Sequence, residues 1–195
     1  MGAAPKHRNG IVQAAVALFR KRGYAATGIN DILLASGAPK GSFYHYFPAG
    51  KEQLGEEALA LAAARVSDTL RELCTTQPNT ASVVRAYGEL LAGWMEKSDF
   101  SDGSPITTTL LETTPQSAAL THAGRTAFRL WREQLAAMLG ADGIGPDTAA
   151  SLASLVVSAW EGALIQTRVE GSRQPISDAS EHLAALIERH LATTA

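Results

Sequence analysis

The sequence predicts an all-α protein of about nine helices. Apolar residues recur every three or four positions along most of the 195 residues, which is the spacing of one helix face. Short segments rich in Gly, Pro, Asn and Ser separate these stretches, as expected between helices. No segment has the alternating pattern of a half-buried strand, and no motif repeats at a fixed period. With 46% hydrophobic residues, the chain can bury a substantial core.

Charge is distributed unevenly along the chain. Residues 1–51 contain seven Lys and Arg and one acid, whereas residues 52–195 contain ten Lys and Arg and eighteen Asp and Glu. The net charge of −2 therefore hides a basic N-terminal part joined to an acidic remainder. This asymmetry favours a polyanion as the partner of the N-terminal part. We predict an N-terminal domain over residues 1–50 and a second domain over residues 51–195.

The first predicted helix ends at Arg22. Its last turn is basic, which suits the negative end of the helix dipole, and Gly23 then stops the helix. Residues 1–5 are predicted to be disordered. Lys6 and Arg8 form either a flexible basic arm that touches DNA or part of a solvated tail.

Residues 27–54 are the most informative stretch of the sequence. Thr27 stands at a helix N-cap position, and the short helix after it ends at Gly37, because Gly enters the left-handed conformation without strain. Pro39 suits the first turn of a second short helix, predicted to extend to Phe47. Two short helices joined by a sharp turn form the helix-turn-helix pattern, whose second helix enters the major groove of DNA.

The exposed positions of this second helix are candidates for contact with DNA. Gly41 lets the backbone approach the duplex closely, and Tyr46 and Lys51 are placed to hold phosphates. The two tyrosines have an alternative interpretation as half-buried packing residues, and the histidine as an ordinary surface residue. The predicted DNA-binding residues are Thr27, Lys40, Gly41, Ser42, Tyr44, His45, Tyr46 and Lys51.

A long helix is predicted from Lys51 to about Cys74. It contains no Pro and no loop, so we expect a rigid strut that the two domains share. The later helices are predicted over residues 81–97, 105–112, 117–139, 147–170 and 176–191.

The last two long helices carry apolar residues along one side, together with small residues that permit close helix approach. Two such pairs would form a four-helix bundle between two chains, so we predict a homodimer. The alternative is that the same residues are internal core. The predicted interface residues are Leu152, Leu155, Val156, Ala159, Ala163, Leu183, Leu186 and Ile187.

All three tryptophans lie in the second domain, near other large apolar side chains at helical spacing. With nearby threonine hydroxyls they are typical of a mostly apolar ligand pocket, although ordinary core aromatics have the same spacing. Glu161 follows a tryptophan inside an apolar helix, and it either lies at the pocket wall or reaches solvent. The predicted ligand-binding residues are Tyr87, Trp94, Met95, Phe128, Trp131 and Trp160.

Composition and motifs argue against several classes of protein. The single cysteine, Cys74, allows no disulfide within the chain, and the five histidines lack metal-ligand spacing. We find no catalytic or cofactor-binding motif, and therefore predict no enzyme, no metal and no cofactor. No apolar stretch reaches the roughly 18 residues of a membrane span, and the N-terminus lacks an apolar signal core. The expected location is the cytoplasm.

The helix-turn-helix stretch also carries a family signature. Its APKGS run and the additional glycine of FPAGKE mark one subgroup. In these features the chain resembles TetR-family transcriptional regulators of the LmrA/YxaF type, over about residues 9–59. The matching positions are Gly23, Tyr24, Ala26, Thr27, Ile32, Ser36, Gly37, Gly41, Tyr44, Phe47 and Lys51 to Leu54.

This resemblance implies a homodimer that binds a palindromic operator in double-stranded DNA. Repression is the commoner activity of such proteins, and a small lipophilic or aromatic ligand, flavonoid-like in this subgroup, releases them from DNA. Beyond the signature, the resemblance lies in the helical architecture and in residues 161–164.

Two other functions stay open from the sequence. One is a helical small-molecule-binding protein whose N-terminal helices are only a scaffold, and the other is an architectural DNA binder without a ligand response. The lack of catalytic motifs argues against the first. An acidic, aromatic body larger than dimerisation needs argues against the second. We therefore favour a ligand-responsive transcriptional regulator.

Overall fold

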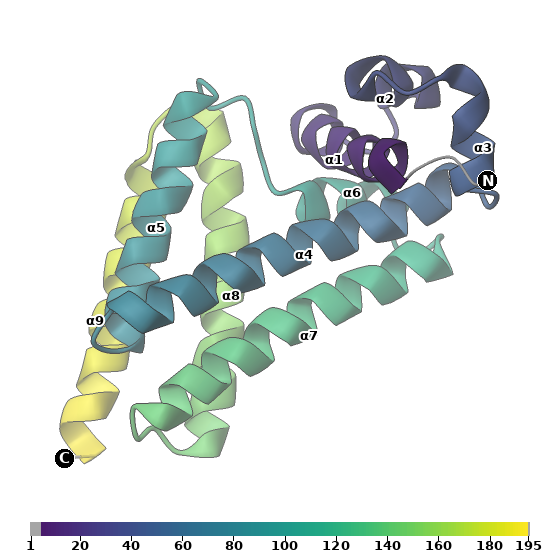
Figure 1. Cartoon of the computed structure of the whole chain (residues 1–195). Helices are drawn as coiled ribbons and strands as arrows, with labels where there is room; N and C mark the ends of the chain where they lie inside the picture. The colour runs from purple at the N-terminus through teal and green to yellow at the C-terminus, as the bar shows by residue number, and fades with distance from the viewer. Residues whose placement is uncertain (1–4, 195) are drawn as a thin grey trace. The chain divides into compact units, whose positions relative to one another are not determined.

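The computed structural model describes residues 5–194, and over this range the chain is helical with no strand (Figure 1). The predicted all-α fold class is confirmed. The helices are α1 (Pro5–Arg22), α2 (Ile29–Ser36), α3 (Phe43–Tyr46), α4 (Lys51–Thr76), α5 (Thr80–Lys97), α6 (Pro105–Thr113), α7 (Ala118–Ala141), α8 (Pro146–Glu170) and α9 (Gln174–Thr194), with a 3-10 turn, η1 (Lys40–Ser42), before α3.

Most boundaries lie within three residues of the predicted ones, because periodicity and Gly or Pro breaks determine them. The second helix of the helix-turn-helix is the exception. Pro39 has an extended ψ of 139° and precedes the 3-10 turn, so the α-helical part contains only Phe43–Tyr46. The prediction of a continuous helix from Pro39 was wrong, because Gly41 and Ser42 favour a tighter turn over a regular first turn.

The expectation for the N-terminal arm is only partly tested. Residues 1–4 and the Lys6 side chain lie outside the described part of the chain. Arg8 lies within α1 and forms an ion pair with Glu57 of α4 at 2.6 Å. Its guanidinium also lies 5.5 Å from the centroid of the Phe47 ring. Arg8 is therefore bound to the folded unit and does not belong to a flexible arm.

Contacts between Cα atoms divide the chain into two compact units. The first contains Met1–Ala64 and Ser104–Ala127, and the second contains Arg65–Gly103 and Phe128–Ala195. Helices α4 and α7 contribute to both units. A boundary at residue 51 between the DNA-binding and ligand-binding functions stays a prediction.

In the first unit, α1 packs against α2 and α6. Phe19 of α1 is buried, and its carbonyl accepts a hydrogen bond of 3.0 Å from the Thr108 hydroxyl of α6. Gly124 of α7 permits close packing, because a Cβ at this position would lie within 3.1 Å of three Leu110 side-chain atoms. The three N-terminal helices are thus braced by α6 and by the start of α7.

In the second unit, α5 packs against α8 and α9. At Gly88 the helices approach so closely that an added Cβ would overlap the side chain of Ser180. Ser180 in turn accepts a hydrogen bond from Trp160 Nε1 at 3.2 Å. Contrary to the expectation from the sequence, helix α8 is long and apolar enough to span a membrane by length and composition, and 44% of its apolar window is buried. One such helix is weak evidence for a membrane span, because core helices of globular proteins have the same length and composition.

We predict that Gly88→Ala lowers the free energy of unfolding by about 1–3 kcal/mol, because the new methyl group overpacks the α5–α9 contact. Gly93→Ala on the same helix is the matched control, since no heavy atom lies within 4 Å of its added Cβ. That control should gain roughly 0.5–1 kcal/mol from helix propensity. Urea unfolding midpoints measure both changes, and equal midpoints would contradict the close contact.

Arg85 ties α5 to α9 through two acids. Its Nε donates to Glu181 at 2.8 Å and its Nη1 donates to Glu188 at 2.5 Å. Hydrogen bonds from Arg85 lower the pKa of both carboxyl groups below their ordinary 4.5. Groups with a depressed folded-state pKa stabilise the fold above the unfolded pKa, and this contribution is lost as pH falls through the folded pKa.

We therefore predict that Arg85→Met destabilises the protein at pH 7 and that its difference from the unmodified chain shrinks below about pH 4.5. Arg129→Met, which removes the same charge from an exposed position on α7, should not show this pH-dependent difference. Urea unfolding at pH 7 and pH 3 tests the expectation. A constant difference would show that the ion pairs contribute nothing.

Candidate functional site

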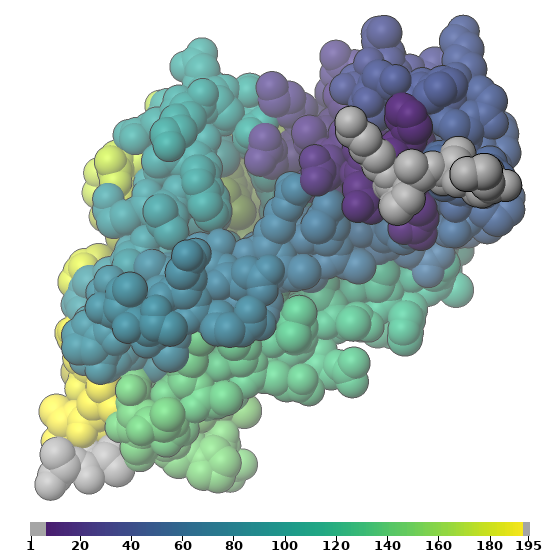
Figure 2. Space-filling view, in the orientation of Figure 1, coloured from purple at the N-terminus to yellow at the C-terminus, as the bar shows by residue number. Residues whose placement is uncertain are grey.

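The segment η1–α3 presents its polar side chains outward. Phe43 and Phe47 on its inner side are fully buried, with ring centroids 5.4 Å apart. Lys40, Gly41 and His45 are exposed, and Tyr44 has 66% of its surface exposed. Figure 2 shows the dark blue atoms of this region at the surface of the first unit. The aromatic pair therefore holds the segment from beneath and leaves its outer face available.

A groove separates this segment from the start of α2. It is lined by Lys40 and Tyr44 on one side and by Gly28 to Asp31 on the other. The Asp31 carboxylate accepts the Gly28 N–H at 3.0 Å and so serves to cap α2. The groove lies where the two helices of a helix-turn-helix meet, and two of its lining residues, Lys40 and Tyr44, are among those predicted to contact DNA.

Thr27 has a different role from the predicted one. Its side chain is fully buried, and its hydroxyl donates to the Gly23 carbonyl at 2.7 Å. Gly28 occupies the N-cap position of α2. The N-cap prediction was wrong, because α2 begins one residue later than predicted. The Thr27 hydroxyl instead bonds back to Gly23 within the loop that precedes α2. With no exposed surface, Thr27 cannot reach a phosphate in this conformation.

The remaining predicted contacts are partly engaged within the protein. The Ser42 hydroxyl donates to the Pro39 carbonyl at 2.6 Å, and Tyr46 is half-buried with its ring 5.1 Å from that of His45. Lys51 Nζ donates to the Tyr24 carbonyl at 2.6 Å. A phosphate contact through Lys51 would have to share or replace that bond.

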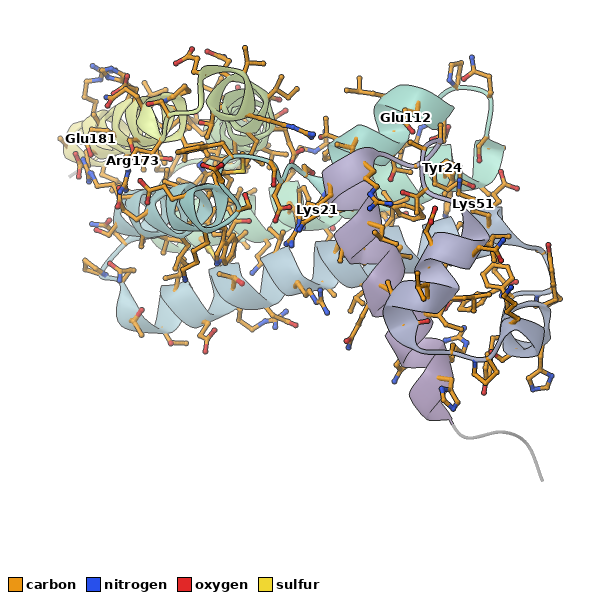
Figure 3. The ribbon with its side chains drawn as sticks, turned by 90° about the horizontal axis from the view of Figure 1, so that it is seen from above. Lys21, Tyr24, Lys51, Glu112, Arg173 and Glu181 are labelled. Carbon is orange, nitrogen blue, oxygen red and sulfur yellow. The ribbon has the colours of Figure 1, made fainter. Side chains whose placement is uncertain are left out.

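Three side chains meet around the loop that follows α1, as Figure 3 shows for Tyr24, Lys51 and Glu112. The Lys51 ammonium lies 4.2 Å from the centroid of the Tyr24 ring. Burial lowers the pKa of Lys51, and the Glu112 carboxylate opposes this by favouring the charged form. Burial also raises the pKa of the Tyr24 phenol, helped by the nearby Glu52 carboxylate.

Glu112 was not predicted from the sequence. Its carboxylate on α6 accepts the Ala25 N–H at 2.5 Å, and a Cβ at Gly23 would overlap it. Gly23 has a φ of 82°, so glycine is favoured there both by the backbone conformation and by the approach of Glu112. The sequence signal was Gly23 alone, which was interpreted only as a helix stop.

Most predicted interface residues are buried within their own chain. Leu152, Val156, Ala163, Leu183 and Ile187 are buried in the second unit, as the alternative interpretation expects, and their role in a dimer interface stays a prediction. On that side α8 and α9 pack against each other and against α5. Ala163 also lines a shallow groove between α8 and α9. By contrast, Leu155 is exposed, and Ala159 and Leu186 are half-buried.

Three of the six predicted ligand-binding residues meet at one cavity. Tyr87, Trp131 and Trp160 line it, whereas Trp94 is 42% exposed and lies outside the lining. Met95 is buried and Phe128 packs on Trp131, also outside the lining. Glu161 is half-buried at the wall, so both of its proposed environments apply in part. The lining residues missed from the sequence are Val66, Leu70, Leu91, Val157 and Leu164.

The cavity has a volume of about 20 Å³. That is close to the minimum for one water molecule and far below the roughly 300 Å³ of a small-molecule site. Among the described residues, no group of three His, Cys, Asp or Glu is placed to hold a metal ion.

An exposed recognition segment on a braced helix-turn-helix is the arrangement of a DNA-binding protein. Residues 11–58 match the family model "Bacterial regulatory proteins, tetR family", and residues 80–182 match "Transcriptional regulator LmrA/YxaF-like, C-terminal domain". The chain belongs to the TetR family of transcriptional regulators, with a C-terminal domain of the LmrA/YxaF type. The family resemblance seen in the sequence is thereby confirmed, and this family comprises regulators of transcription, not enzymes.

Individual proteins show the same relationship. An HTH-type transcriptional regulator of Mycobacterium tuberculosis is 34% identical, over 92% of this chain and 93% of that protein. The HTH-type transcriptional regulator LmrA of Bacillus subtilis is 28% identical, over 93% of this chain and 97% of that protein. The crystal structure of a TetR transcriptional regulator from Chloroflexus aurantiacus is 29% identical with a TM-score of 0.78, over 94% of this chain and 95% of that one.

We predict that Lys40→Ala and Tyr44→Ala each weaken operator binding, by about 1–3 kcal/mol per half-site or roughly tenfold to a hundredfold, without unfolding the protein. Both side chains are exposed, so the fold does not depend on them. Lys97→Ala at the end of α5 removes the same charge outside the helix-turn-helix and should keep full affinity. Fluorescence anisotropy with operator DNA measures binding. Full affinity of the Lys40→Ala or the Tyr44→Ala protein would show that the recognition segment is misassigned.

Proposed function

We propose that the protein is a cytoplasmic homodimeric repressor that binds a palindromic operator and is released by a small molecule. The observation that carries the proposal is the outward face of η1–α3, held in place by the buried Phe43 and Phe47. One helix-turn-helix domain, called the head from here on, contacts only a few base pairs. Two heads in a dimer bind two half-sites related by a two-fold axis, which gives a palindromic site with a defined half-site spacing.

The outer faces of α8 and α9 support the dimer. A shallow groove between the two helices is lined by small residues, among them Gly162, Ala163 and Ala179, and by polar residues that include Glu170 and Asp178. Apolar and small side chains run along both sides of it at helical spacing and stay wholly or partly exposed. They are Leu155, Ala159, Gly162, Ile165 and Val169 in α8, and Pro175, Ala179 and Leu186 in α9. A second copy of this face would cover them and form an intermolecular four-helix bundle.

The cavity around Tyr87, Trp131 and Trp160 is the proposed effector site. Its walls come from α4, α5, α7 and α8, and α4 also begins beside the DNA-binding head. A ligand that enlarges the cavity would displace α4 and change the spacing of the two heads. Release requires that the ligand bind the displaced form better, and coupling energies of about 1–3 kcal/mol are typical. A small lipophilic or aromatic molecule suits the lining, and a flavonoid-like compound is the class that the family resemblance implies.

Selection of bound sequences from a random duplex pool tests the proposal. We expect a palindrome, and binding that weakens roughly a thousandfold between 50 and 200 mM salt if about six phosphates are contacted. The Lys40→Ala protein serves as the control and should enrich the palindrome much less strongly than the unmodified chain. A single unpaired half-site would contradict the dimer. Failure of a folded dimer to enrich any sequence would favour a small-molecule-binding protein without sequence recognition.

A further inference from the structure

We propose that the cavity of the second unit binds a flat, neutral ligand through a hydrogen bond from the Tyr87 hydroxyl to a carbonyl oxygen of that ligand. The proposal rests on the assignment of this cavity as the effector site. It adds to that assignment one polar group on an otherwise apolar ligand, and it names the residue that recognises this group.

The polar groups of the lining differ in whether they are already engaged. Trp160 Nε1 donates to Ser180 at 3.2 Å, and both Trp131 and Glu161 have interaction partners of their own. The Tyr87 hydroxyl, in contrast, forms no hydrogen bond within the described part of the chain. The remaining lining residues are aliphatic. Tyr87 is therefore the lining residue whose hydrogen-bonding group is left for a ligand.

The burial of Tyr87 makes an unused hydroxyl unusual. The side chain is 3% exposed and lines the cavity, so bulk water has little access to it. Buried polar groups are nearly always hydrogen-bonded, because an unpaired group loses its bonds to water without compensation. A ligand with an acceptor beside Tyr87 would supply the missing bond, whereas a purely apolar ligand would leave the hydroxyl unpaired.

The surroundings of the phenol also fix its protonation state. Burial raises the pKa of Tyr87, and the Glu161 carboxylate raises it further. The phenol therefore stays protonated at neutral pH and can donate a hydrogen bond. Because Glu161 lines the same cavity, its effect on the phenol also indicates that the hydroxyl lies on the cavity side of Tyr87.

The apolar remainder of the lining restricts the kind of acceptor. A carboxylate or phenolate would lose more hydration than aliphatic walls return, so a charged acceptor is disfavoured. A ligand hydroxyl would bring a further donor that needs a partner of its own. A carbonyl oxygen satisfies the Tyr87 O–H and adds no donor. The Tyr87 and Trp160 rings, with centroids 4.5 Å apart, favour a flat body that can lie against an aromatic face.

The test compares two probes, 9-fluorenone and fluorene, on the full-length protein. Both are flat, neutral tricyclic molecules of similar size, and they differ in a carbonyl that replaces a methylene group. Isothermal titration calorimetry measures their binding, and fluorescence anisotropy with operator DNA measures release. Fluorenone should bind more tightly than fluorene and should release the operator at a correspondingly lower concentration.

Variants assign the preference to its residue. Tyr87→Phe removes only the hydroxyl, and the affinity ratio of fluorenone to fluorene should fall about tenfold in this protein. Comparing the ratio between the two proteins cancels the difference in hydration of the probes. Thr69→Val removes a hydroxyl from α4 outside the lining and should keep the full ratio. An unchanged ratio in Tyr87→Phe would overturn the proposal.

The same variant has an expected result without any ligand. Because the Tyr87 hydroxyl has no partner to lose, the urea midpoint of Tyr87→Phe should equal or exceed that of the unmodified protein. A clearly lower midpoint would show that the hydroxyl is already bonded within the protein, and it would also overturn the proposal.

The outcomes separate this proposal from the function on which it rests. If both probes release the operator and Tyr87→Phe leaves their affinity ratio unchanged, the ligand-released regulator stands and the hydrogen-bond requirement is wrong. If neither probe binds, the hydrogen-bond proposal is overturned, and DNA binding is judged separately by the sequence selection.

Discussion

The contact between Lys51 and Tyr24 is the interaction on which the first unit depends. The ammonium both donates to the Tyr24 carbonyl and lies over its ring, so the first turn of α4 is fixed to the loop between α1 and α2. Glu112 of α6 holds the same loop through the Ala25 N–H. Moving the loop would leave a partly buried ammonium and a carboxylate without these partners, which is costly. The helix-turn-helix is therefore carried by α1, α4 and α6 as one body.

The sequence predicted the helices well and their tertiary roles unevenly. Long apolar periodicity with Gly and Pro breaks is local information, which is why α4 to α9 agree within a few residues. The spacing of Phe43 and Phe47 likewise showed which side of the recognition segment is buried. From the sequence, the Thr27 hydroxyl could bond either to a backbone N–H in the first turn of α2 or to the Gly23 carbonyl. Only the folded loop shows that it bonds to Gly23.

The second unit shows the limit of periodicity more clearly. An apolar stripe predicts that one side of a helix is buried, but it does not predict whether that side packs against the same chain or against a partner. Leu152 and Leu155 are three residues apart in α8, yet the first is in the core and the second is exposed. The cavity depends in the same way on long-range packing, since Val66 and Leu70 of α4 meet Trp160 of α8 only in the folded unit. The tryptophans indicated the region, and the aliphatic part of the wall carried no separate signal.

The near-complete filling of the cavity by the protein's own side chains has a consequence for how such a regulator discriminates. A molecule that needs an enlarged cavity must first separate the Tyr87 and Trp160 rings, and its apparent affinity is reduced by the fraction of protein in the enlarged form. If that form were populated at about 1%, every candidate would bind about a hundredfold more weakly than its contacts alone would allow. Abundant metabolites that fit the cavity poorly would then occupy only a small fraction of the protein at their ordinary concentrations. At the proposed effector site, this packing would act as a filter against background, set by the stability of the closed core and independent of the shape of any one ligand.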